Sequence, residues 1–221
     1  ARSPGGWLRP VLRLVLAVSL DGRLAPPQGG AAQLCGIGDR QVLEEALAWA
    51  DGCLIGAETL RCHGSTCLIR APHLLAERAA SGRAEQPVAV VVSRSNDFSP
   101  DLHFWRQPLQ RWLLTPKRSP LAPAFDRRLD LENWGVALAA LADQGLDRLV
   151  VLGGAALAAS LLAEGWIDEL QLTLCPRLLG GPHAWLPLET AVQAGEWCLQ
   201  EHRRLEGEEL LLRYRRVLAK P

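Results

Sequence analysis

Apolar runs separated by polar segments predict that strands and helices alternate along the chain. The run V-L-R-L-V-L-A-V-S at 11–19 is apolar and β-rich, which is typical of a central strand buried on both faces. Further apolar runs predict strands at 52–56, 87–93, 111–115, 147–152 and 167–175. The intervening segments predict helices at 40–50, 131–143 and 155–163, and a helical turn that opens the segment 57–71.

The end of the chain changes pattern, because two strand-like runs follow each other with only a short turn between them. These runs, at 198–205 and 209–217, flank Glu206-Gly207-Glu208 and predict an antiparallel hairpin. Strands that alternate with helices and close with a hairpin predict an α/β fold. Its central sheet would be mixed and mostly parallel, with helices on both faces.

Turn and breaker residues predict where several of these elements begin and end. Asp39 is placed to cap the N-terminus of the 40–50 helix, and Gly165 to stop the 155–163 helix. Apart from the strand at 111–115, the proline-rich segment from about 94 to 130 indicates connecting surface rather than core.

Length and composition fit a single compact domain over residues 1–221. The chain is 48% hydrophobic, and its 24 Lys and Arg residues balance its 24 Asp and Glu residues. No basic stripe is present, which argues against nucleic acid or an anionic membrane as a partner. The apolar run at 11–18 is interrupted by Arg13 and is too short to cross a bilayer.

The six cysteines are scattered and predict reduced, buried thiols in a cytoplasmic protein.

The stretch V-L-G-G-A-A-L at 151–157 passes from a strand through two glycines into a helix. Such a joint can hold a phosphate, because the first N–H groups of a helix lack internal partners and glycine lets an anion approach the backbone. The pattern matches neither the Rossmann fingerprint nor the P-loop. Taken alone, a pair such as Gly153-Gly154 more often forms a tight packing turn than a phosphate site.

Several motifs occur together in a familiar order: S-L-D-G at 19–22, I-G-A-E-T-L at 55–60, L-G-G-A-A-L at 152–157 and P-R-L-L-G-G at 176–181. With them the chain resembles, over residues 9–217, the pyrimidine reductases of riboflavin biosynthesis. The resemblance implies a dihydrofolate reductase-like fold, a three-layer sandwich. It also implies an NADPH-dependent reductase that transfers hydride to the ring-opened ribosylamine of a phosphorylated pyrimidine, as 5-amino-6-(5-phosphoribosylamino)uracil reductase does. The zinc deaminase motifs that often precede this reductase are absent from the sequence.

The resemblance also implies which residues contact the cofactor. By position they are Ala17, Thr59, Ser93, Arg94, Gly153, Gly154, Ala155 and Ala156. Ser93 and Arg94 could hold the 2′-phosphate that distinguishes NADPH from NADH, since arginine binds phosphate bidentately. The alternative is that this pair forms a solvated strand end.

The substrate half of the site departs from the family pattern. Arg70 matches a substrate-binding arginine, and the resemblance places Cys67 and Gln33 at the substrate, although Gln33 stands where the family has tryptophan. Leu152 replaces the glutamate that often precedes the double glycine, and His63 lies where aspartate is usual. A different small substrate, or a paralogue that binds NADPH without turnover, is therefore the alternative function.

His63 is the candidate catalytic residue, because a histidine can donate a proton near neutral pH. Its alternative is an exposed loop histidine. Cys62, His63 and Cys67 are too irregularly spaced for a zinc site, so no metal is expected. The apolar Leu210–Leu212 in the terminal hairpin predicts a homodimer that covers this edge, unless the 131–143 helix covers it within one chain.

Overall fold

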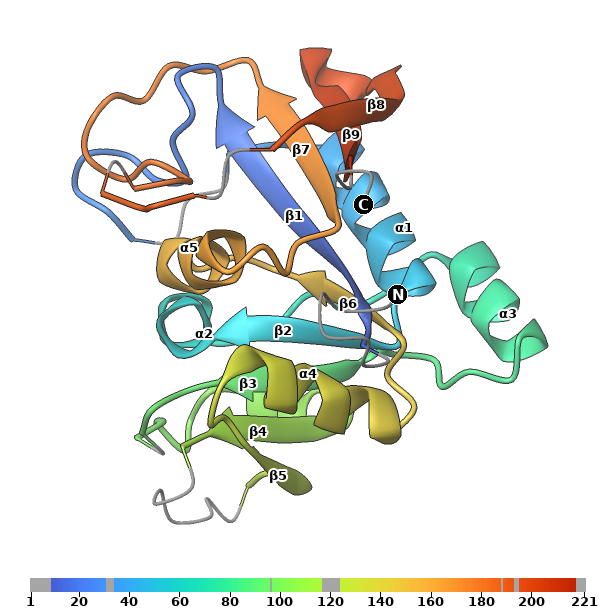
Figure 1. Ribbon diagram of the computed structural model, residues 1–221. Coiled ribbons are helices and arrows are strands. Elements are labelled where there is room, and N and C mark those ends of the chain that lie inside the picture. The colour runs from blue at the N-terminus through green and yellow to red at the C-terminus, as the bar shows by residue number, and fades with distance from the viewer. Residues whose placement is uncertain are drawn as a thin grey trace. The chain divides into compact units, whose positions relative to one another are not determined.

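The computed structural model describes residues 9–30, 34–95, 97–116, 124–187, 189–192 and 195–217 (Figure 1). Gln33 lies outside these residues. Nine strands and five α-helices alternate along the described chain, which confirms the α/β fold. The described residues form two compact units, one with Glu44–Gly154 and the residues up to Val11, and the other with Leu12–Leu43 and the residues from Ala155 on.

The first unit contains a sheet of five strands in the order β5-β4-β3-β2-β6, and every neighbouring pair is parallel. Parallel neighbours need crossover connections, and helices between the strands supply several of them. The strands are β2 (Gly52–Gly56), β3 (Val88–Val92), β4 (Arg111–Thr115), β5 (Arg127–Asp130) and β6 (Arg148–Val151). The helical segments are α2 (Ala57–His63), α3 (Pro72–Ala80), the 3-10 turn η1 (His103–Arg106) and α4 (Trp134–Asp143).

The proline-rich segment contributes to the core of this unit, so the prediction of connecting surface was wrong. Phe104 in η1 is fully buried, and Phe125 is nearly so. Trp105 packs edge-to-face against both Phe104 and Phe125. The prolines separate short apolar groups rather than a continuous run, which hides their burial from a periodicity argument.

The second unit contains four strands in the order β1-β7-β9-β8. β1 (Val11–Ser19) pairs in parallel with β7 (Glu169–Cys175), and β9 (Leu210–Arg216) is antiparallel to both β7 and β8 (Trp197–Arg204). β8, the turn η2 (Glu206–Glu208) and β9 form the predicted hairpin, shown in red in Figure 1. α1 (Ile37–Trp49) begins in this unit, and α5 (Ala155–Ala163) has the predicted bounds.

Asp39 does not cap the N-terminus of α1, because the helix begins two residues earlier, at Ile37. The Glu209 carboxylate instead accepts hydrogen bonds from the backbone N–H groups of Gly36 and Asp39. Gly38 allows this turn to approach the hairpin, since a β-carbon there would lie 2.7 Å from the Leu205 β-carbon. A carboxylate near a helix N-terminus is stabilising, and this one is supplied from 170 residues away in the sequence.

The last turn of α1 is held by two arginines. The buried Arg78 guanidinium donates to the carbonyl oxygens of Leu47, Ala48 and Ala50, at 3.3, 3.1 and 2.6 Å. Arg83 donates to Ala48 at 2.9 Å. Burial and the nearby Arg83 lower the pKa of Arg78 to about 10, so it remains protonated at neutral pH. Arg78 therefore satisfies helix carbonyls that have no partner within the helix.

The prediction of reduced, buried cysteines was wrong for most of the chain's thiols. Cys35 and Cys175 form a disulfide that joins the segment before α1 to the end of β7. Cys62 and Cys198 are exposed, and Cys53 is buried, which raises the pKa of its thiol to about 12. The pairing could not be read from the sequence, because 140 residues separate the two partners.

In the part of the chain that the structure describes, no helix combines the length and the apolar character needed to cross a membrane.

Candidate functional site

The loop S-L-D-G, after β1, is tied to the loop P-R-L-L-G-G, after β7, through the side chain of Asp21. Its carboxylate accepts hydrogen bonds from the Ser19 hydroxyl at 2.6 Å and from the backbone N–H groups of Leu179 and Gly180 at 3.0 and 2.8 Å. These bonds, first of all the one from Ser19, hold the pKa of Asp21 far below its ordinary value. Asp21 therefore shapes the turn and is ionised at neutral pH.

Three predicted cofactor segments of the first unit lie at the same edge of its sheet. Gly56 at the end of β2 pairs with Val92 at the end of β3, so Thr59 in α2 and the pair Ser93-Arg94 both follow this edge. Leu54 in β2 pairs with Val151 in β6, which places Gly153 and Gly154 just beyond the same edge. Carboxyl ends of parallel strands are where open α/β sheets bind their ligands.

The two glycines have backbone conformations that explain their identity. Gly153 has φ 97° and Gly154 has φ 92°. Residues with a β-carbon rarely adopt this backbone conformation. The next residue, Ala155, begins α5 and is half-buried, while Ala156 is exposed. The backbone here can therefore present the free N–H groups of a helix start to an anion, which fits a dinucleotide pyrophosphate.

Ser93 and Arg94 differ in their surroundings. The buried Ser93 hydroxyl donates to the backbone oxygen of Ser95 at 2.6 Å, so it fixes the turn after β3. Arg94 is exposed. Arg61, from α2, holds the next segment through two bonds of 3.1 Å to the backbone oxygen of Asp97. The sequence contained no signal for this second cation near the strand end.

The predicted catalytic and substrate residues of the first unit lie on or after α2. His63 is the last residue of this helix and is exposed, and Gly64 caps the helix with φ 68°. Cys67 is half-buried, and Arg70 is exposed while its backbone N–H donates to Glu44 at 2.7 Å. Among the described residues, no group of three or more His, Cys, Asp or Glu side chains could hold a metal ion.

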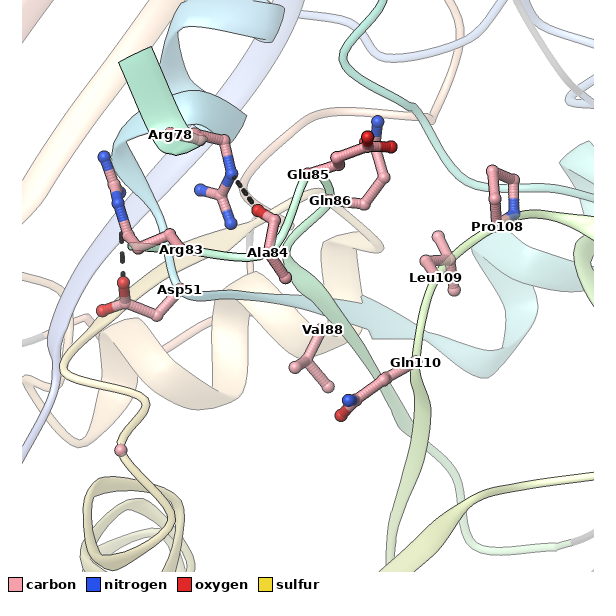
Figure 2. Close-up of a pocket in the computed structure, with 11 residues that line it drawn as sticks. Asp51, Arg78, Arg83, Ala84, Glu85, Gln86, Val88, Pro108, Leu109 and Gln110 are labelled. Atoms are coloured by element: carbon pink, nitrogen blue, oxygen red, sulfur yellow. Dashed lines mark hydrogen bonds and ion pairs between the residues drawn. The ribbon is translucent and has the colours of Figure 1, made fainter. Parts of the chain in front are cut away.

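One pocket, of about 520 Å³, lies at the amino-terminal edge of the first unit's sheet, beside the first residue of β3, Val88. Figure 2 shows Arg78 directed at Ala84 and Arg83 directed at Asp51 across this pocket. The same two arginines bind the carbonyls of α1, and Asp51 also binds Arg148 at 3.2 Å. Asp51, Arg78 and Arg83 in this pocket therefore stabilise the fold. The pocket lies at the sheet edge opposite to the one that carries the cofactor segments.

A second pocket, of about 490 Å³, lies within the second unit and includes the predicted cofactor contact Ala17. Asp39 and Arg40 from α1 also line it, together with Cys35 of the disulfide. Burial raises the pKa of the Asp39 carboxyl and the Glu209 charge raises it further, while a hydrogen bond from Thr173 and the charge of Arg40 oppose them. The sequence pattern indicates only a helix cap at Asp39, because nothing in the pattern marks the burial of this side chain.

Comparison with known proteins identifies relatives over nearly the whole chain. The family model described as the RibD C-terminal domain matches residues 10–208. The 2,5-diamino-6-ribosylamino-4(3H)-pyrimidinone 5′-phosphate reductase of Methanothermobacter thermautotrophicus is 28% identical over 189 residues, which are 80% of this chain and 82% of that protein.

Two solved structures are informative about the fold. RibD of Acinetobacter baumannii superposes with a TM-score of 0.80 at 24% identity, over 95% of this chain and 58% of that one. Dihydrofolate reductase of Enterococcus faecalis, in complex with NADP(H), superposes with a TM-score of 0.54 at 13% identity, over 95% of this chain and 98% of that one. These similarities confirm the dihydrofolate reductase-like fold.

Proposed function

We propose, since the chain belongs to the RibD C-terminal domain family, that it is an NADPH-dependent reductase. The observation that carries the proposal is the gathering of Thr59, Ser93-Arg94 and Gly153-Gly154 at one carboxyl edge of a parallel sheet. A glycine-lined helix start and an exposed arginine beside a strand end suit a pyrophosphate and a 2′-phosphate. The RibD C-terminal domain match over residues 10–208 supports one reductase domain over residues 1–221.

The proposed substrate is a ribosylaminopyrimidine phosphate. The support is the archaeal relative, which is named as a reductase of such a compound and aligns with 80% of this chain. The departures from the family pattern at Leu152 and His63 leave two alternatives. In the first, the protein reduces a related small substrate. In the second, it binds NADPH without turnover.

Bound NADPH would supply a hydride. The residues of this chain have the tasks of binding and orientation. The backbone of Gly153-Gly154 and the start of α5 would hold the pyrophosphate, Arg94 the 2′-phosphate, and Ala17 and Thr59 further parts of the dinucleotide. Arg70, Cys67 and Gln33 would contact the substrate, with His63 as a candidate proton donor.

The test is oxidation of NADPH, followed by absorbance, in the presence and absence of the phosphorylated ribosylaminopyrimidine. Turnover that depends on the pyrimidine supports the proposal. Tight NADPH binding without turnover would favour the non-catalytic alternative, and the absence of NADPH binding would contradict the proposed cofactor.

We expect NADPH to bind more tightly than NADH, and Arg94→Ala to remove most of this preference. Charge-assisted hydrogen bonds from arginine to a phosphate are worth about 2–3 kcal/mol in total in such settings. Titration of both cofactors against wild type and variant measures the difference. Arg106→Ala, which removes another exposed arginine of the same unit, is the matched control and should keep the preference. Equal wild-type affinity for NADH and NADPH would contradict the role of Arg94.

We also propose a homodimer with no nucleic acid or membrane partner. Leu211 is buried within the chain, whereas Leu199, Leu210 and Val217 of the same hairpin are 44%, 36% and 45% exposed. β8 is the outer strand of its sheet, and an exposed apolar edge is commonly covered by an identical edge. Light scattering at micromolar concentration should give about twice the single-chain mass of 24.1 kDa, and a monomeric mass would refute the dimer.

A further inference from the structure

The pocket of the second unit brings a carboxyl group beside a strand position that we assign to the cofactor. Ala17 in β1 pairs with Thr173 in β7, and the Thr173 hydroxyl hydrogen-bonds the Asp39 carboxyl. Ala17 and Asp39 both line the pocket. Asp39 therefore contacts Thr173, the strand partner of Ala17, and the cofactor would lie against Ala17.

Among the described residues that line this pocket, Asp39 is the single carboxyl group and Arg40 is the single cation. Thr173 is 2% exposed and fixes one side of the carboxyl group. The backbone N–H of Asp39 is bound to the buried Glu209, at 2.8 Å, which fixes the helix turn that carries the side chain. A group held in this way, with one side open to a pocket, is oriented toward whatever occupies the pocket.

The surroundings also decide the protonation state. Burial and the Glu209 carboxylate on β9 favour the neutral acid, while Arg40 on α1 and the Thr173 hydroxyl on β7 favour the anion. Because burial is the largest of these effects, the pKa of Asp39 is raised, and the acid keeps its proton to a higher pH than an exposed aspartate does. A retained proton is what a general acid requires.

We propose that Asp39 is the proton donor of the reduction. The inference rests on the proposed reductase function. In the reduction, the acceptor carbon gains a hydride, which carries both electrons, from the dihydronicotinamide. The C=N π bond of the ring-opened ribosylamine breaks, and its nitrogen takes the proton of the Asp39 carboxyl group. Asp39 is left as a carboxylate and regains a proton from water.

The activity test compares Asp39→Asn with wild type. Asparagine keeps the shape and can still accept from Thr173, but it has no acidic proton. We expect kcat to fall about 100-fold or more, with the affinity for NADPH little changed. Wild-type kcat should decline as the pH rises through the pKa of Asp39, and this limb of the profile should be absent from Asp39→Asn and present in Asp39→Glu. Asp143→Asn, at an exposed carboxyl group on α4, is the control and should behave as wild type.

A second measurement does not depend on turnover. Carbon NMR of the free protein with labelled aspartate should show one carboxyl resonance that titrates above the ordinary aspartate range and is missing from Asp39→Asn. An ordinary or lowered titration would overturn the inference. The inference would also be overturned if wild type reduces the pyrimidine, Asp39→Asn retains the wild-type rate and His63→Asn loses activity. A wild type that turns over no pyrimidine would instead overturn the proposed function, and the inference with it.

Discussion

Replacement of both Cys35 and Cys175 by alanine is expected to lower the free energy of unfolding by about 3–5 kcal/mol relative to the oxidised protein. The bond closes a loop of 140 residues, so it restricts the unfolded chain strongly. In the folded chain it joins the segment before α1 to the end of β7. The loss should appear as a lower midpoint of urea unfolding.

The same loss should follow when wild type is unfolded in the presence of a dithiol reductant. Cys198→Ser is the control, since Cys198 is exposed and outside the disulfide, and it should unfold like wild type. Identical midpoints for oxidised wild type and the double variant would show that the two thiols contribute no crosslink. Because Cys35 also lines the pocket that contains Asp39, NADPH oxidation by the double variant should be measured at a temperature where it remains folded.

Gly154→Val is expected to weaken NADPH binding by at least about 100-fold, which corresponds to about 2.7 kcal/mol. Two effects act together. The β-branched side chain would occupy the space through which an anion approaches the N–H groups at the start of α5. The backbone at φ 92° also disfavours valine by about 1–3 kcal/mol, which would alter the local conformation.

Gly82→Val separates these effects. Gly82 has φ 68° and no atom within 4 Å of its expected β-carbon, so this variant has comparable backbone strain away from the proposed phosphate site. It should lose stability and still bind NADPH like wild type. Titration by cofactor fluorescence, with circular dichroism to verify folding, measures both variants. If folded Gly154→Val binds NADPH normally, the glycines serve the backbone turn alone.

The identity of most elements was accessible from the sequence, because short-range patterns specify them, although β5 (Arg127–Asp130) was not predicted. β1, β4 and α5 have the predicted bounds, and the terminal hairpin turns at Glu206–Glu208 as expected. Apolar period and turn chemistry involve residues within a few positions of each other. The glycine pair was also recognisable, although its positive φ angles add a conformational reason to the proposed phosphate contact.

Only the tertiary structure decided which distant residues meet. Glu209 in place of Asp39 holds the start of α1, Cys35 pairs with Cys175, and Phe104 is fully buried in a proline-rich stretch. The polar partners of a helix end, the partner of a thiol and the burial of an isolated aromatic depend on the order and direction of strands. That order follows from packing the whole chain. The amino-acid pattern near Asp39 indicates a helix, whereas burial and the nearby Glu209 charge, which only the tertiary structure supplies, raise the pKa of the Asp39 carboxyl group.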